Sequence, residues 1–284
     1  ISACLVGSEM CIRDRQYTSG TTGFPKGVML THYNVVNNGK NIGDCMDLST
    51  ADRLMIQVPM FHCFGMVLAM TASITHGTTL CPIPYFSPRV SLDCINKLQI
   101  TAFHGVPTMF IAMLEHKDFA TTDFSHMRTG IMAGSPCPIK VMQDVIEKMH
   151  MPEICITYGQ TEASPGCTMS KTTDSIEDRV NTVGGAMFGV ECKIVDPETG
   201  KELPDNVDGE FVARGYNIMK GYYKMPHATA QAIDADGWLH TGDLARRLPN
   251  GYFKITGRIK DMIIRGGENI YPKEIEDFIY TNPK

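Results

Sequence analysis

The sequence lacks the features that would place it in a membrane, outside the cell or on a nucleic acid. No stretch approaches the roughly 18 uninterrupted apolar residues that a membrane-spanning helix needs. Its ten cysteines include no C-x-x-C pair and lie mostly in apolar runs, which is typical of reduced core thiols. Basic residues are scattered and the net charge is -5, so there is no basic patch for a nucleic acid or an anionic surface. We therefore expect a soluble, cytoplasmic protein with no nucleic-acid partner and no membrane span.

Three catalytic signatures are also absent. The sequence contains neither a G-x-S-x-G nucleophile elbow nor an H-E-x-x-H zinc motif. A Walker A loop needs glycine before its lysine and a hydroxyl residue after it, whereas Pro25 precedes Lys26 and Gly27 follows it. These absences argue against a Walker-type NTPase, a serine hydrolase and a zinc protease.

The stretch "YTSGTTGFPKGVMLTH", residues 17–32, is nonetheless suited to holding a phosphate. Glycines and small hydroxyl residues let backbone N–H groups turn inward around an anion, and the positive end of a following helix adds to the attraction. Thr31 is a suitable N-cap for a helix that begins at His32. The alternative is a flexible linker, but a linker predicts no fixed pattern.

The chain predicts an α/β fold in its larger part. From Gln16 to about residue 185, apolar strand patterns alternate with helical patterns, which favours parallel strands with flanking helices. Ligands in such folds collect at the carboxyl ends of the strands. The polar clusters "AGSPCP", residues 133–138, and "YGQTEASPG", residues 158–166, both follow predicted strands.

Residues 186–256 change to short alternating runs separated by Asp-Pro, Asp-Gly and Asn-Gly, which predicts a small antiparallel β module. Residues 257–284 are expected to begin a C-terminal α+β domain, with a helix from Pro272 that carries an apolar face. Because this helix has nothing after it to pack against, we expect a truncated chain.

The first fifteen residues are expected not to be native. "MCIRDR", residues 10–15, resembles the translation of an adapter used in sequencing libraries, and the natural sequence is expected to resume at Gln16. The alternative is a native N-terminal segment.

Four motifs follow one another in a fixed order: residues 17–32, "TYGQTE" at 157–162, "GWLHTGDLA" at 237–245, and "GYFKITGRIKDMIIRGGENIYPKEIE" at 251–276. Together they resemble the adenylate-forming (AMP-binding) superfamily, and most of all its fatty and medium-chain acyl-CoA synthetases. The resemblance implies that ATP, magnesium and coenzyme A serve the activation of a small carboxylic acid through an acyl-adenylate. Such catalysis is mostly positioning and charge stabilisation, so it needs no protein nucleophile.

The resemblance assigns two phosphates to the first motif and part of the nucleotide pocket to the cluster after residue 132. The β- and γ-phosphates fall to Thr18, Ser19, Gly20, Thr21, Thr22, Gly23 and Lys26. Gly134 and Ser135 are expected to line the nucleotide pocket with backbone groups.

In the second motif, the resemblance places the ring of Tyr158 on the adenine, with Gly159 and Gln160 beside it in the nucleotide site. Thr161 would contact the α-phosphate and Glu162 would ligate magnesium, so these two residues and the lysine of the first motif form the expected catalytic set. The alternatives are an ordinary strand-end tyrosine and a solvated loop glutamate.

The later motifs are expected to hold the ribose. Asp243 would accept hydrogen bonds from both hydroxyls, and Arg258 would reach the ribose and a phosphate with its planar fork. Lys260 matches the hinge about which the C-terminal domain swings in the family. Aspartate is otherwise a common turn residue, and Lys260 could be a surface lysine.

His62, in "PMFHCFG", matches a position near the acyl tunnel of the family, although a buried core histidine is the alternative. Amino-acid-activating relatives carry an aspartate after this phenylalanine, so we expect a substrate without an α-amino group. An aryl or amino-acid adenylation unit and a non-catalytic nucleotide-binding module stay open as alternatives. The segment that precedes the first motif in the family is missing, as is the late C-terminal lysine, so this fragment is expected to bind nucleotide weakly and not to run the full reaction.

Overall fold

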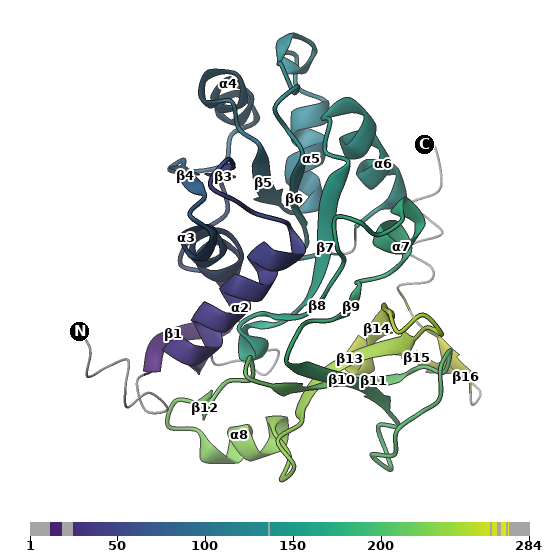
Figure 1. Cartoon of the computed structure of the whole chain (residues 1–284). Helices are drawn as coiled ribbons and strands as arrows, with labels where there is room; N and C mark the ends of the chain where they lie inside the picture. The colour runs from purple at the N-terminus through teal and green to yellow at the C-terminus, as the bar shows by residue number, and fades with distance from the viewer. Residues whose placement is uncertain are drawn as a thin grey trace.

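A seven-stranded sheet forms the upper part of the molecule in Figure 1. The computed structural model describes residues 12–18, 25–135, 137–261, 263–265, 268–270 and 272. The strands follow the order β4 (Thr79–Pro82), β3 (Arg53–Ile56), β5 (Ala102–Gly105), β6 (Thr129–Met132), β7 (Glu153–Gly159), β8 (Gly166–Met169) and β9 (Gly185–Ala186). The pairs from β4 to β7 are parallel, as the sequence predicts, whereas β8 and β9 extend the sheet in antiparallel fashion.

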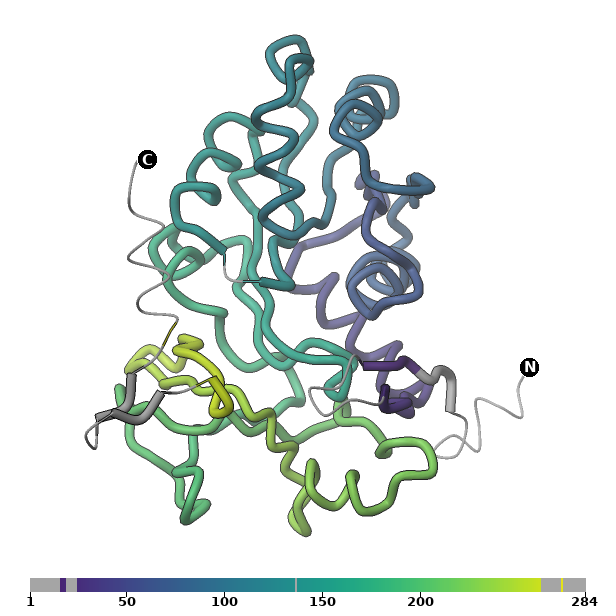
Figure 2. Tube along the Cα trace, turned by 180° about the vertical axis from the view of Figure 1, so that it is seen from behind, coloured from purple at the N-terminus to yellow at the C-terminus, as the bar shows by residue number. Residues whose placement is uncertain are grey.

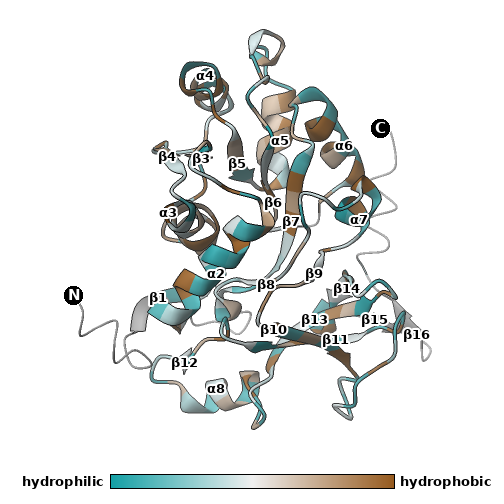
Figure 3. Ribbon diagram, viewed as in Figure 1, coloured by the Kyte–Doolittle hydropathy of each residue, from teal (hydrophilic) through white to brown (hydrophobic). Residues whose placement is uncertain are grey.

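Helices cover both faces of this sheet. One face carries α2 (His32–Cys45), the π-helix η2 (Phe64–Thr71) and α3 (Ala72–His76), and the other carries α4 (Pro88–Leu98), α5 (Pro107–Leu114) and α6 (Ile139–Lys148). The remaining helices in the described ranges are η3 (Phe119–Thr121), η4 (Thr161–Ala163), α7 (Ile176–Asn181), α8 (Pro226–Ala232) and η5 (Ile259–Asp261). Figure 3 shows hydrophobic segments along β6, β7 and α5.

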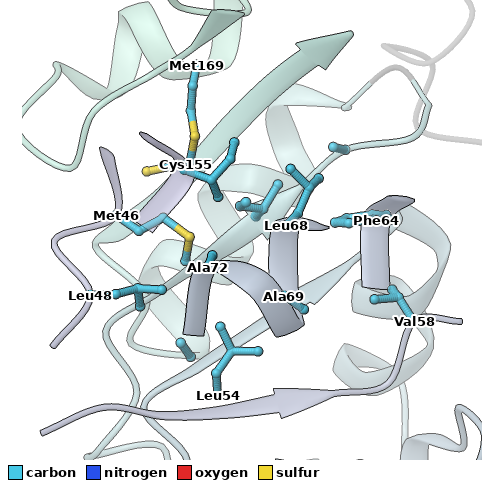
Figure 4. Close-up of a cluster of buried hydrophobic side chains, with 14 of the residues drawn as sticks. Met46, Leu48, Leu54, Val58, Phe64, Leu68, Ala69, Ala72, Cys155 and Met169 are labelled. Carbon is cyan, nitrogen blue, oxygen red and sulfur yellow. The ribbon is translucent and has the colours of Figure 1, made fainter. Parts of the chain in front are cut away.

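The two helical layers explain why the strands read as continuous apolar runs. Leu54 and Ile56 of β3 are buried toward α2 and η2, while Met55 between them is buried toward α4. Figure 4 shows the hydrophobic cluster on the side of α2 and η2, in which Leu54 lies near Ala69. Side chains alternate across a strand, so a strand covered on both faces needs an apolar residue at every position.

The predicted start of α2 is confirmed. Thr31 Oγ1 accepts a hydrogen bond from the Asn34 N–H at 3.1 Å, and Asn34 Oδ1 accepts one from the Thr31 N–H at 2.7 Å. This capping box satisfies two backbone donors that the first turn of a helix leaves without partners.

Three smaller sheets form the lower part. The predicted antiparallel module is present as β10 (Val190–Val195), β11 (Gly209–Gly215), β13 (Leu239–Arg247) and β14 (Phe253–Arg258). A two-stranded sheet follows, made of β15 (Ile263–Arg265) and β16 (Glu268–Ile270). The helix predicted from Pro272 lies almost wholly outside the described residues.

The third small sheet joins distant parts of the sequence. It contains β1 (Ile12–Thr18), β2 (Lys26–Thr31) and β12 (Gly221–Tyr222), all antiparallel. The view from behind shows the purple start of the chain beside the light green segment that carries β12 (Figure 2). The pairing of β12 with β2 was not predicted, because it joins residues about 190 positions apart. β1 continues across the junction between Arg15 and Gln16, so the strand does not mark a boundary there. The non-native origin of residues 1–15 stays a prediction.

Two expectations about composition can be compared with the described part of the chain. The eight cysteines in these ranges are all free thiols, as predicted. No helix within the same ranges combines the length and the apolarity required to cross a bilayer.

Arg128 ties together the amino ends of three parallel strands. Its guanidinium donates to both carboxylate oxygens of Asp52, at 2.9 and 2.7 Å, and also to Glu153 at the start of β7. Asp52 is 3% exposed and also accepts from Thr101 Oγ1 at 2.8 Å. Burial alone would raise the pKa of Asp52, but the bonds from Arg128 and Thr101 outweigh it and hold the pKa below its ordinary value.

We predict that Arg128→Met lowers the free energy of unfolding by about 3–5 kcal/mol, because it leaves the Asp52 carboxylate buried without its cation. Urea denaturation near pH 7 measures the loss. Lys97→Met is the control, since it removes an exposed lysine paired with Asp93 one helical turn away, and it should leave the midpoint unchanged. Equal midpoints for the two variants would contradict a structural role for Arg128.

Candidate functional site

A pocket of about 490 Å³ opens at the carboxyl edge of β6 and β7, where the large sheet meets two of the small ones. Its walls come from β1 and β2, from η2, from the segment after β7, from β12, and from β13 to η5. This is the edge at which parallel α/β sheets bind ligands.

The pocket collects most of the residues that the sequence analysis selected. Those that line it are Thr18, Lys26, His62, Gly134, Tyr158, Gly159, Gln160, Thr161, Glu162, Asp243, Arg258 and Lys260. Ser135 is exposed and is not among the lining residues. Ser19, Gly20, Thr21, Thr22 and Gly23 lie outside the described residues. The individual roles of these residues stay predictions.

Tyr158 and Asp243 meet across two sheets. The Tyr158 hydroxyl, at the end of β7, donates to Asp243 Oδ2 at 2.7 Å, and Arg258 Nε lies 3.1 Å from Oδ1. Asp243 and Arg258 are directly opposite each other on β13 and β14, so the strand register sets their pairing. The Tyr158 ring packs edge-on against Phe211 with 4.9 Å between centroids, which fixes the plane of the ring.

Burial sets the protonation of this pair. It raises the pKa of Tyr158 well above its usual value, with a further contribution from the Asp243 charge, so the phenol stays a hydrogen-bond donor. Burial also raises the pKa of Asp243, although the bonds from Tyr158 and Arg258 act in the opposite direction. The chain therefore holds a carboxylate in the pocket at some cost in folding free energy.

Glu162 is the second pocket carboxylate, and it lies on η4 with 9% of its surface exposed. Tyr222 of β12 donates its hydroxyl to Glu162 Oε1 at 2.8 Å. The Lys26 ammonium lies 4.8 Å from the centroid of the same tyrosine ring, within the range of a cation–π interaction. Tyr222 could not be found from the sequence motifs, because only the long-range pairing of β12 with β2 brings it to the pocket.

The residues present fit a magnesium ion that is shared with phosphates. No group of three or more histidine, cysteine, aspartate or glutamate side chains that could hold a metal occurs among the residues that the structure describes. Magnesium does not need such a cage, because it commonly binds one or two carboxylates together with substrate phosphates and water. Glu162 can supply one such carboxylate.

The end of the pocket that faces η2 is more apolar. Phe64 and Leu68 line it together with His62, whose Nδ1 accepts the Phe64 N–H at 3.1 Å. His62 is exposed, so the alternative interpretation of it as a buried core histidine is wrong.

A different histidine is buried behind this apolar end. His104 has no exposed surface, and its Nδ1 accepts the Ile131 N–H at 3.1 Å. The proton is therefore on Nε2, which donates to the Leu68 carbonyl at 2.9 Å, and the ring stacks on Phe64 with 6.0 Å between centroids. Burial lowers the pKa of His104 to about 4, so the ring is neutral at physiological pH. Nothing in its local sequence distinguishes His104 from other strand residues.

Backbone packing explains the glycine in the second motif. A Cβ on Gly159 would lie 1.8 Å from the Pro165 carbonyl oxygen, so any side chain would push the strand end and the following loop apart. The chain turns tightly here and brings Gln160, Thr161 and Glu162 to the pocket.

We predict that Asp243→Asn stabilises the unliganded chain near pH 7. The pKa of Asp243 is raised in the folded state, so ionisation costs stability above that pKa and costs nothing when pH falls to the ordinary value of 3.8. The stability gained by the amide should thus shrink as pH falls through the raised pKa. Urea denaturation of both proteins at several pH values measures this difference. A variant that is less stable than the parent near pH 7 would contradict the assignment.

Comparison with known proteins identifies the family to which these features belong. The AMP-binding enzyme family matches residues 15–223. "Putative acyl-CoA synthetase YngI" of Bacillus subtilis is 57% identical over 94% of this chain and 49% of its own length. "Medium-chain acyl-CoA ligase ACSF2, mitochondrial" of Bos taurus is 44% identical over 95% of this chain and 45% of its own length.

The solved structures agree. The ATP-bound crystal structure of MatB from Rhodopseudomonas palustris superimposes with a TM-score of 0.88 at 34% identity, and the match covers 96% of this chain and 53% of that one. The chain spans about half the length of the relatives that it matches. The resemblance noted in the motifs is confirmed, and the chain belongs to the AMP-binding enzyme family.

Proposed function

We propose that this chain forms the ATP site of an acid–thiol ligase that converts a carboxylic acid to its coenzyme A thioester. The observation that carries the proposal is the pocket itself, whose lining includes Lys26, Glu162 and Asp243 as well as the apolar side chains of η2. A cation, a metal-binding carboxylate and a ribose acceptor match a nucleotide, and the apolar wall matches an acyl group.

The reaction has two displacements. A carboxylate oxygen of the acid attacks the α-phosphorus of ATP, and the bond to the β-phosphate oxygen breaks with release of diphosphate. The thiol of coenzyme A then attacks the acyl carbon of the adenylate, loses its proton and expels AMP. Neither step forms a bond to the protein, which agrees with a pocket that contains donors and charges but no nucleophile motif.

Each of these residues would bind a different part of the nucleotide. Lys26 would neutralise charge on the leaving phosphates, and Thr161 would donate to the α-phosphate. Asp243 is already fixed by Tyr158 and Arg258 and has lone pairs left for the ribose hydroxyls. Tyr158 would present its ring to the adenine. Glu162 would hold magnesium, which when bound draws charge from the phosphate oxygens.

We further propose an aliphatic acid without an α-amino group. Phe64 and Leu68 line the pocket with apolar side chains, and His62 stands at the position where amino-acid-activating relatives carry an aspartate for the ammonium. Two relatives, which are named as an acyl-CoA synthetase and a medium-chain acyl-CoA ligase, support this choice.

Calorimetric titration of the purified chain with MgATP tests the nucleotide site. We expect weak binding, with a dissociation constant toward the millimolar end of typical substrate values. Lys26→Met should weaken binding about tenfold, because it removes a charged donor to phosphate. Lys140→Met is the matched control, since Lys140 is an exposed lysine on α6 that pairs with Asp144 outside the pocket. Equal affinities for the two variants would contradict the site.

The protein expressed from the complete open reading frame that encodes this chain can be used to test the proposed reaction. Exchange of labelled diphosphate into ATP should depend on added acid and should be faster with aliphatic acids than with amino acids. Exchange driven by amino acids would instead support an amino-acid adenylation unit, and absence of any acid-dependent exchange would support a non-catalytic nucleotide-binding module.

A further inference from the structure

We propose that Tyr222 is a positioning residue that aims the Glu162 carboxylate and the Lys26 ammonium at the same phosphate group. The inference rests on the proposed ATP site and adds to it a residue from outside the four motifs. Tyr222 makes both contacts with different parts of one side chain, the hydroxyl and the ring face.

The hydroxyl restricts the rotation of Glu162. It donates to Oε1 at 2.8 Å, and the structure gives Oε2 no hydrogen-bond partner within the described part of the chain. Both side chains are nearly buried, with Tyr222 at 7% and Glu162 at 9% exposure, so water can hardly replace the bond. One carboxylate oxygen is therefore held, and the other is left to a metal ion. Partners of this kind orient metal ligands, and their loss commonly weakens metal binding.

The main chain beside Tyr222 also holds the helix that carries Glu162. The Met219 N–H donates to the Glu162 carbonyl at 2.8 Å, three residues before the tyrosine. The segment from residue 219 to 222 thus contacts both the backbone and the carboxylate of Glu162.

The ring face orients the lysine. Lys26 is the first residue of β2, and β12 pairs with β2 so that Tyr222 lies opposite Val28. The register puts the ammonium 4.8 Å from the ring centroid. An aromatic face attracts a cation but carries no opposite charge of its own, so the contact leaves the Lys26 ammonium available to a phosphate.

Tyr222 is itself held rigidly. Its N–H donates to Thr229 Oγ1 on α8 at 2.9 Å. Gly221 before it has φ +137°, and a Cβ there would lie 2.7 Å from the Thr229 side chain. The close approach of α8 to β12 therefore depends on this glycine, and it leaves the tyrosine little freedom to follow Glu162 if the carboxylate turns.

The test compares ATP affinity with magnesium and with EDTA, by calorimetric titration of the 284-residue chain. The ratio of the two affinities reports the metal, and the EDTA affinity reports the fold and the nucleotide site. Tyr222→Phe keeps the ring and removes the hydroxyl, so we expect the ratio to fall about tenfold. Tyr222→Leu removes the ring as well, so it should also lower the EDTA affinity through Lys26.

Two comparisons separate positioning from a general structural effect. Tyr252→Phe is the matched control, because Tyr252 donates to the Asp174 carboxylate at 2.7 Å and does not line the pocket, and its ratio should equal that of the parent. Glu162→Gln should lower the ratio, and adding Tyr222→Phe to it should lower the ratio no further.

The outcomes are distinct. A ratio unchanged by Tyr222→Phe, or additive losses in the double variant, would overturn the inference and leave the ATP site standing. A parent chain that binds no ATP in either condition would instead overturn the proposed function, and the inference with it.

Discussion

Two hydrogen bonds between tyrosine hydroxyls and nearly buried carboxylates determine how the pocket is built. Tyr158 on the large sheet donates to Asp243 on the four-stranded sheet, and Tyr222 on the three-stranded sheet donates to Glu162 on η4. A carboxylate removed from water needs such donors, because an unpartnered buried charge costs several kcal/mol. The bonds therefore join three sheets at one place while keeping two negative groups available to a ligand.

The stabilising ion pairs of Arg128 and the binding pocket lie at opposite edges of the large sheet. Arg128, Asp52 and Glu153 tie together the amino ends of the strands, and the pocket occupies the opposite, carboxyl edge. Helices on both faces bury the strands between these edges. The pocket edge can consequently hold a carboxylate such as Asp243, whose burial costs folding free energy, because the core and the amino edge supply stability elsewhere.

Local chemistry explains which features the sequence could predict. The Thr31 cap, the parallel strands and the antiparallel module follow from patterns within a few residues. The sequence motifs contain many of the residues that line the pocket. Tyr222 and His104 could not be found in this way. Tyr222 reaches the pocket only through the pairing of β12 with β2, and His104 depends on a carbonyl in η2. Ser135 follows β6 in the sequence but is not among the pocket-lining residues, whereas Ala133 and Gly134 before it are.

We propose that one pocket, lined by both tyrosine–carboxylate pairs, holds all parts of ATP at once. A crystal structure of the chain grown with MgATP tests it most directly. We expect the ribose at Asp243, the triphosphate between Lys26 and Glu162, and the metal on the Glu162 oxygen that Tyr222 does not contact. A nucleotide bound elsewhere, or one whose phosphates lie away from Glu162 and Lys26, would show that this pocket is not the ATP site.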